Sequence, residues 1–383
     1  MVRLKEVVIH KYRCLANDLT LDVSDKITSI IGKNEIGKTS MLEAIAKANY
    51  FDSANTRFKY DKLFDYPRKD IHDDGISDEA AVTLTYEMSD EMIREIEEYL
   101  RRPLVDTEFS IKTDYSGKRT LTHADDLVND YVYETFIMPS IPNFLFYDEL
   151  SMLPSRVSVN RLINSDDLTD AERTAKALVM LSGLDLEELS GAKNFEIYKK
   201  KLEEAEGRIS REFSKYWSGN QNLQLELELV QQEPAQETKK KKFFFFGGGD
   251  KDDELDNLYI DIRIHDRKNM ISLPFEKRSK GFKWFFSFFV WFMAVQKEHA
   301  ANFIFLLDEP GINLHEEAQD DLMNLMKDIS EDAQIIFSTH SPYMIVDNDN
   351  ANYALEDSPS GTVASLINPS KEYTEKANKE VSC

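Results

Sequence analysis

The sequence predicts an α/β fold, and three observations indicate it. A short apolar run, Ile27 to Ile31, is followed by Gly32 to Ser40, which fits the phosphate-loop pattern G-x-x-x-x-G-K-[ST]. A helical run, Ser40 to Ala48, comes next. Far along the chain, a second apolar run, Phe303 to Leu307, precedes two carboxylates. Apolar runs of this length are typical of buried parallel strands, whose carboxyl ends carry the ligand sites of open α/β sheets.

The loop after the first strand has the composition of a polyphosphate site. Its glycines permit backbone angles that a Cβ forbids, and its N–H groups and the following helix start can point together at phosphates. We expect Lys38 to reach the β- and γ-phosphates and the Thr39 hydroxyl to bind Mg²⁺. A chance turn is the alternative, and the flanking strand and helix argue against it. The predicted nucleotide-binding residues are Gly32, Lys33, Asn34, Glu35, Ile36, Gly37, Lys38, Thr39 and Ser40.

The composition limits which classes of protein this chain can belong to. With 383 residues, 42% of them hydrophobic, the chain can bury a sizeable core in one large domain that carries an insertion. The net charge of −23 means that any contact with DNA must come from local basic patches. Two cysteines, Cys14 and Cys383, argue against a disulfide framework or a cysteine zinc site. We found no signal peptide or long apolar segment, so no membrane partner and a cytoplasmic location are expected.

Alternating apolar and polar residues predict an antiparallel sheet region in the N-terminal part. The expected strands are Leu4 to Tyr12, Leu19 to Val23 and Ala81 to Glu87. Ser89 is expected to cap a helix that ends near Arg101. In the loop-rich segment 49–74, Arg68 and Lys69 either face phosphates or DNA or belong to a solvated loop.

The middle of the chain predicts a short strand pair after Asp106, a buried strand from Phe144 to Asp148, and then two helices. The helices, Leu168 to Leu181 and Asn194 to Trp217, form an inserted helical hairpin, a possible dimerisation element. Lysines and arginines alternate with glutamates on the second helix, which favours a salt-bridged, solvated face over a DNA-contacting one. The expected organisation is an ATPase head in two parts, 1–165 and 219–350, a helical insertion at 166–218, and a C-terminal tail at 351–383.

Two further strands, Leu223 to Val230 and Leu258 to Ile264, flank the low-complexity stretch Lys239 to Gly249. We interpret this stretch as a long hairpin loop. Contact of its lysines and phenylalanines with DNA or a partner protein is the alternative.

The second half of the site follows the late apolar strand. Asp308 is suited to hold Mg²⁺, and Glu309 to polarise the attacking water. Another buried strand, Gln334 to Ser338, leads to His340, which is placed to bond the γ-phosphate or the water. The predicted catalytic residues are therefore Lys38, Glu309 and His340, with Thr39 and Asp308 as metal ligands. Two carboxylates that only end a strand, and a structural histidine, are the alternatives.

The order of these motifs, the phosphate loop, then L-L-D-E-P, then S-T-H-S-P, is similar to the ABC-type ATPase head of repair and chromosome-maintenance proteins. It most resembles the OLD (overcoming lysogenization defect) family of ATPases, to which Gabija-type defence ATPases are related. The segment Glu276 to Phe288 resembles that family's signature segment. The resemblance implies that Ser279 and Gly281 approach the γ-phosphate bound to another protomer, with charge added by Arg278 or Lys280. It also implies that Gly311 to His315 crosses a dimer interface.

The resemblance implies an α/β, ABC-type P-loop ATPase head that takes ATP and Mg²⁺ as cofactors and forms a homodimer or a higher oligomer. Many OLD-family proteins continue into a Toprim nuclease domain, and we find no room or metal-binding pattern for one after His340. Asp347 to Asp349 is interpreted as a turn. Nuclease activity is not expected from this chain alone. A Toprim-type nuclease, as a further domain or as a separate chain, and DNA are expected as partners, in phage defence or DNA repair. A nucleotide-gated scaffold with little turnover is the alternative function.

Overall fold

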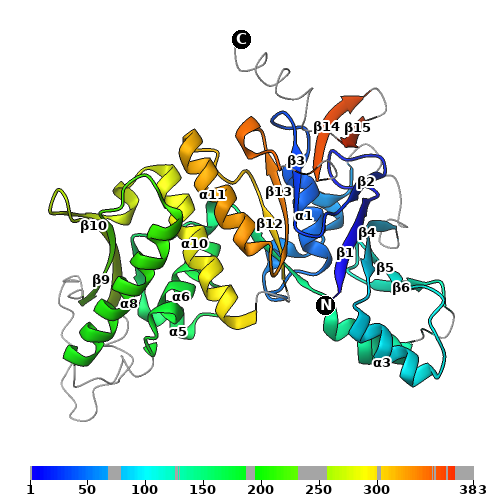
Figure 1. Cartoon of the computed structure of the whole chain (residues 1–383), viewed down its shortest axis with the longest axis horizontal. Helices are drawn as coiled ribbons and strands as arrows, with labels where there is room; N and C mark the ends of the chain where they lie inside the picture. Colours follow the sequence, from blue (N-terminus) through cyan, green and yellow to red (C-terminus); the bar gives the residue numbers. More distant parts are fainter. Residues whose placement is uncertain are drawn as a thin grey trace, which may run out of the picture. The chain divides into compact units, whose positions relative to one another are not determined.

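The computed structural model describes residues 2–67, 79–125, 128, 130–186, 195–231, 257–299, 303–346, 348, 351–358 and 361–366 (Figure 1). The chain divides into two compact units. Unit 1 comprises Met1–Asp148, His299–Ile312 and Met323–Cys383, and unit 2 comprises Glu149–Glu298 and Asn313–Leu322.

A six-stranded sheet forms the centre of unit 1, in the order β15-β14-β3-β13-β12-β7. All neighbours are parallel except β14 and β15. All residues of β3 and β13 are buried, as the apolar runs predicted, because parallel strands are covered on both faces. The strands are β3 (Ile27–Ile31), β7 (Asn143–Tyr147), β12 (Phe303–Leu307), β13 (Gln334–Thr339), β14 (Asn352–Ser358) and β15 (Gly361–Leu366).

The antiparallel sheet expected in the N-terminal part is present, in the order β2-β1-β4-β5-β6. Its strands are β1 (Arg3–Ile9), β2 (Leu19–Asp22), β4 (Ala80–Glu87), β5 (Glu108–Asp114) and β6 (Arg119–His123). The Ser89 side chain accepts a hydrogen bond from Met92 N and caps α3 (Asp90–Leu100), as predicted. Short helices complete this part, namely α2 (Lys62–Asp65) and α4 (Asp130–Val132).

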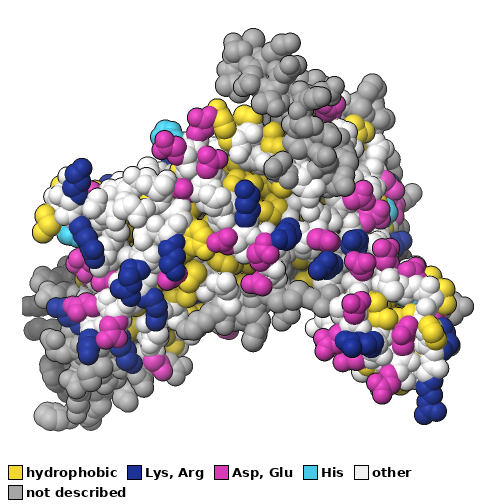
Figure 2. Space-filling view, viewed as in Figure 1, with side chains coloured by type: hydrophobic (Ala, Val, Ile, Leu, Met, Phe, Trp, Pro, Cys, Tyr) yellow, Lys and Arg dark blue, Asp and Glu magenta, His cyan; other side chains and the backbone are white. Residues whose placement is uncertain are grey.

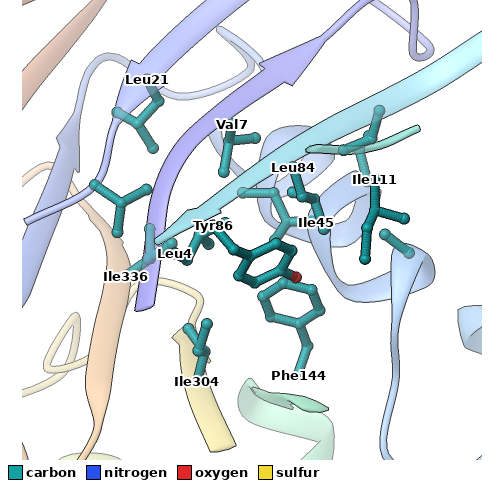
Figure 3. Packing of buried hydrophobic residues seen from close by; sticks show 14 of the residues in the cluster. Leu4, Val7, Leu21, Ile45, Leu84, Tyr86, Ile111, Phe144, Ile304 and Ile336 are labelled. Atoms are coloured by element: carbon teal, nitrogen blue, oxygen red, sulfur yellow. The ribbon is translucent and has the colours of Figure 1, made fainter. Parts of the chain in front are cut away.

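Helix α1 (Lys38–Ala48) contributes Ile45 to a core that both sheets share (Figure 3). The same cluster contains Leu84 and Tyr86 from β4, Phe144 from β7 and Ile336 from β13. The helix that begins at the phosphate loop is therefore held by apolar contacts with elements of both sheets, which fixes where its first turn lies.

Unit 2 contains a third sheet and most of the remaining described helices. Strand β10 (Leu258–Asp266) pairs antiparallel with β8 (Arg156–Ser158), β9 (Leu223–Gln231) and β11 (Ile271–Pro274). The predicted pairing of the two strands around the low-complexity stretch is thus confirmed. The helices are α5 (Val159–Asn164), α6 (Asp170–Ser182), α8 (Phe195–Tyr216) and α10 (Lys280–His299). Helix α11 (Glu316–Ile329) begins in unit 2 and ends in unit 1.

The phenylalanine-rich helix α10 is buried against α8. Phe213 of α8 lies edge-on to Phe286 and Phe289, with ring centroids 4.9 and 5.4 Å apart. Trp217 packs on Phe282 and Phe285 in the same way. Such edge-to-face aromatic pairs stabilise a packed core beyond the area that they bury.

Helix α8 carries the mixed charges that the sequence indicated. Lys200 lies 3.9 Å from Glu204, and Lys215 lies 2.6 Å from Glu212. In the region of α8, Figure 2 shows basic and acidic side chains interspersed. This arrangement supports the salt-bridged face over a purely basic one.

The structure changes one expectation, and several others concern residues that it does not describe. Residues 352–358 and 361–366, expected to lie in a C-terminal tail, form β14 and β15. Strand β14 pairs with β3, and its residues from Asn352 to Leu355 are buried. Arg68, Lys69, the Lys239 to Gly249 stretch, Asp347 and Asp349 lie outside the described residues. No helix in the described ranges is long and apolar enough to cross a bilayer.

Candidate ATP site

The phosphate loop is shaped by two positions where a side chain does not fit. Gly37 has φ +110°, and a Cβ there would lie 2.9 Å from Leu15 Cδ2 and 3.0 Å from Cys14 Sγ. A Cβ on Gly32 would lie 3.1 Å from the carbonyl oxygen of Leu355. The loop can follow this path only with glycine at Gly37, because L side chains rarely adopt this φ.

The loop lines a cavity of about 240 Å³. The lining residues are Cys14, Asn34, Glu35, Gly37, Lys38, Thr39, Ser40 and Glu309. Six of the predicted nucleotide-binding residues thus share one cavity with a predicted catalytic carboxylate. Cys14 was not among the predicted residues, because no sequence motif relates it to the phosphate loop.

Lys38 is held at the centre of the loop. Its side chain is 5% exposed, and its ammonium donates to the carbonyl oxygens of Gly32 and Lys33 at 2.7 and 2.9 Å. The same nitrogen lies 3.0 Å from Oε1 of Glu309. A buried ammonium with three oxygen partners is an oriented positive charge, as binding of a phosphate requires.

Asp308 receives two hydroxyl hydrogen bonds from different elements. The Thr39 hydroxyl, at the start of α1, donates to the Asp308 carboxylate at 2.8 and 3.0 Å. The Ser338 hydroxyl, on β13, donates to Oδ1 at 2.7 Å. Burial raises the pKa of Asp308, the two hydroxyl bonds lower it, and the nearby negative charges of Glu309 and Asp148 raise it further. The pKa of Asp308 therefore lies above the ordinary value of an aspartate.

Glu309 connects the lysine to the predicted histidine. Its Oε2 lies 2.8 Å from Nδ1 of His340, while Oε1 contacts Lys38. The backbone of Glu309 has φ +48°, a left-handed conformation that is costly for a residue with a Cβ. All three predicted catalytic residues are thus brought together by the ends of β12 and β13 and the start of α1.

The donor set fits ATP with Mg²⁺. Asp308 and Thr39 offer hard oxygen ligands, which Mg²⁺ prefers, and few protein ligands are needed because the ion keeps waters and phosphate oxygens. Since the Thr39 proton points at Asp308, the lone pairs of the Thr39 oxygen remain available to a cation.

Ser279 and Gly281 lie at the start of α10, in unit 2. The Ser279 hydroxyl accepts a hydrogen bond from Phe282 N at 3.4 Å, as an N-cap does. A Cβ on Gly281 would lie 2.4 Å from the carbonyl oxygen of Asn313, so this glycine allows the close approach of the Asn313 backbone. Their role toward a second nucleotide, which the family resemblance implies, stays a prediction.

Comparisons with known proteins identify a family for this chain. A family model described as an AAA domain matches residues 6–243, and a second, described as an AAA ATPase domain, matches residues 162–345. An uncharacterized protein of Methanocaldococcus jannaschii is 34% identical over 86 residues, which cover 21% of this chain and 22% of that protein. The matched segment is thus a small part of the relative's length.

The fold of this chain is similar to that of solved structures. A crystal structure of an SMC head bound to the C-terminal winged-helix domain of ScpA aligns with a TM-score of 0.50 at 16% identity, covering 95% of this chain and 98% of that one. A Pyrococcus furiosus SMC head with an extended coiled coil, bound to the C-terminal domain of ScpA, aligns at 15% identity over all of both chains. Its TM-score is 0.47, so the fold assignment rests on the first structure. The chain belongs to the AAA domain family, and its fold is that of the ABC-type P-loop ATPase head of SMC proteins.

Proposed function

We propose that this chain is an ATP hydrolase that depends on Mg²⁺. One observation carries the proposal, namely that Glu309 lies within hydrogen-bonding distance of both Lys38 and His340 while Asp308 bonds to Thr39. These residues come from three separate segments of the chain. A site that only bound a phosphate would need the loop and Lys38, and would not need a carboxylate beside a histidine.

The residues divide the work of phosphoryl transfer to water. Mg²⁺, when bound, would neutralise charge on the phosphate oxygens, and Thr39 and Asp308 would hold it. Lys38 binds the phosphates through a fixed positive charge. Glu309 accepts a proton from the attacking water, and His340 orients the Glu309 carboxylate by the bond at 2.8 Å.

We further propose an OLD-like assembly in which two chains hold two nucleotides between the phosphate loop of one and Ser279 and Gly281 of the other. The N-cap geometry of Ser279 supports this, since a helix start offers N–H groups to a phosphate. ATP would join the protomers and its hydrolysis would separate them, because the two nucleotide states differ in affinity for the joined form. The output would be control of a nuclease on DNA, in phage defence or repair.

A nucleotide-gated scaffold with little turnover is the second candidate. The ion pair between Lys38 and Glu309 favours it, because a carboxylate held by the phosphate-loop lysine is not free to accept a proton from water. In that case the chain would bind ATP and a partner and would hydrolyse slowly.

ATP turnover with Mg²⁺, with and without linear duplex DNA, separates the candidates. Lys38→Ala serves as the blank, and Lys112→Ala, which removes an exposed lysine of β5, serves as the matched control. Turnover that exceeds the blank supports the hydrolase, and stimulation by DNA supports the role in DNA processing. Tight ATP binding with turnover equal to the blank would favour the scaffold, and no ATP binding would contradict both.

A further inference from the structure

Ser338 contacts both carboxylate residues of the site. It lies on β13 next to the end of β12, where Phe337 pairs with Leu307 in parallel register, and it is 0% exposed. Its hydroxyl is 2.7 Å from Asp308 Oδ1 and 2.8 Å from Glu309 N. One buried oxygen thus joins the side chain of one residue to the backbone of the next.

The chemistry of the partners fixes the direction of both bonds. A backbone N–H can only donate, so the Ser338 oxygen accepts from Glu309 N. The proton of the hydroxyl is therefore available for Asp308, whose ionised carboxylate can only accept. No other orientation satisfies all three groups, so Asp308 Oδ1 is held at a set distance from the turn that carries Glu309.

The bond to Glu309 N also acts on a strained residue. Glu309 has φ +48°, and a non-glycine residue keeps such a conformation only where its surroundings hold it. Ser338 holds the N–H side of this residue, while the Glu309 carbonyl oxygen accepts from Ile312 N at 3.4 Å. The conformation aims the Glu309 side chain at Lys38 and His340.

We propose that Ser338 is a positioning residue for ATP hydrolysis, which sets the geometry of Asp308 and Glu309 through one hydroxyl group. This inference rests on the proposed hydrolase function. Ser338 touches neither the nucleotide nor the water in this scheme. It acts through the carboxylate of Asp308 and the backbone N–H of Glu309, as groups behind metal ligands act when they orient those ligands.

The chain provides a matched control. Ser29 lies on the neighbouring strand β3, is also 0% exposed, and donates to Asn352 Oδ1 at 2.6 Å. Ser29→Ala and Ser338→Ala each remove one buried hydroxyl from the same sheet. Both variants are expected to lose similar stability, and only the second removes a bond to the site.

The experiment measures Mn²⁺ binding by electron paramagnetic resonance with a non-hydrolysable ATP analogue, nucleotide binding in EDTA, and kcat for ATP. For Ser338→Ala we expect about 10- to 100-fold losses in Mn²⁺ affinity and in kcat, the usual range for groups behind metal ligands. Binding in EDTA stays unchanged, and Ser29→Ala matches the wild type in all three. Ser338→Cys is the second variant, for use if Ser338→Ala does not fold. It places a slightly larger and only weakly hydrogen-bonding thiol at this position, and we expect the same losses.

Wild-type Mn²⁺ affinity and kcat in either Ser338 variant would overturn the inference and leave the proposed hydrolase standing. An equal loss in Ser29→Ala would also overturn it, because the effect would then come from stability. If the wild type shows no nucleotide-dependent Mn²⁺ binding, the proposed function fails and takes the inference with it.

Discussion

The ammonium of Lys38 lies 3.0 Å from Oε1 of Glu309, although one residue follows the first buried strand of the parallel sheet and the other follows the strand β12. The opposite oxygen of Glu309 bonds to His340. Glu309 therefore connects the phosphate loop with the segment that carries His340. Substitutions of Glu309 and of His340 test its two contacts separately.

Glu309→Gln keeps the shape of the side chain and removes its charge. The variant is expected to bind ATP and to accumulate as a dimer, because hydrolysis no longer separates the protomers. Light scattering after size-exclusion chromatography, with saturating ATP and Mg²⁺, measures this. A folded variant that stays monomeric under these conditions would show that the two-nucleotide dimer is wrong.

His340→Ala removes the partner of Glu309 Oε2 without touching the phosphate loop. We expect kcat to fall about 10- to 100-fold with little change in ATP affinity, as for other groups that orient a catalytic side chain. Steady-state kinetics separate kcat from KM. His265→Ala, in β10 of unit 2, is the control and is expected to leave both unchanged. Equal kcat in the wild type and His340→Ala would assign the histidine a structural role.

Gly281→Ala introduces a Cβ that would lie 2.4 Å from Asn313 O and 2.7 Å from Leu314 Cδ2. The backbone oxygen cannot move away cheaply, so the free energy of unfolding should fall by about 1–3 kcal/mol, the usual cost of overpacking. Chemical denaturation measures it.

Gly207→Ala is the matched control within unit 2. A Cβ there meets only the end of the flexible Arg211 side chain, at 3.4 Å, inside helix α8. Alanine should raise the free energy of unfolding by up to about 1 kcal/mol through its higher helix propensity. Similar losses in both variants would mean that the contact with Asn313 is not the cause.

The lowered pKa of Glu172 predicts that the stability of the fold depends on pH. Two hydrogen bonds from Arg161, at 2.6 and 2.9 Å, together with bonds from Thr169 in a capping box, lower the pKa of Glu172 to about 2. A carboxyl whose folded-state pKa is lowered stabilises the fold above its unfolded pKa of about 4.5 and loses that contribution as pH falls toward 2.

Glu172→Gln should therefore unfold at a lower temperature than the wild type at pH 7, and the difference should shrink below about pH 4.5. Thermal melts between pH 7 and 3 test this. Glu98→Gln, an exposed glutamate of α3, is the control and is expected to melt as the wild type does at each pH. A difference that stays constant over this range would exclude the carboxylate as its source.

Local patterns in the sequence determined much of the site. The phosphate loop, the apolar strands with Asp308 and Glu309 after them, and the helix start at Ser89 were readable because each depends on a short stretch of chain. Parallel strands buried on both faces have to be apolar along their whole length, so β3, β12 and β13 could be placed within a residue or two.

Tertiary structure decided what depends on residues distant in the chain. The pairing of β14 with β3 makes an expected tail part of the central sheet, and Cys14 lines the cavity at the phosphate loop. No sequence pattern distinguishes Ser338 from other serines in predicted strands. Only the parallel register of β12 and β13 places its hydroxyl between Asp308 and Glu309, because hydrogen bonds need positions within a few tenths of an ångström and sequence spacing does not carry that information.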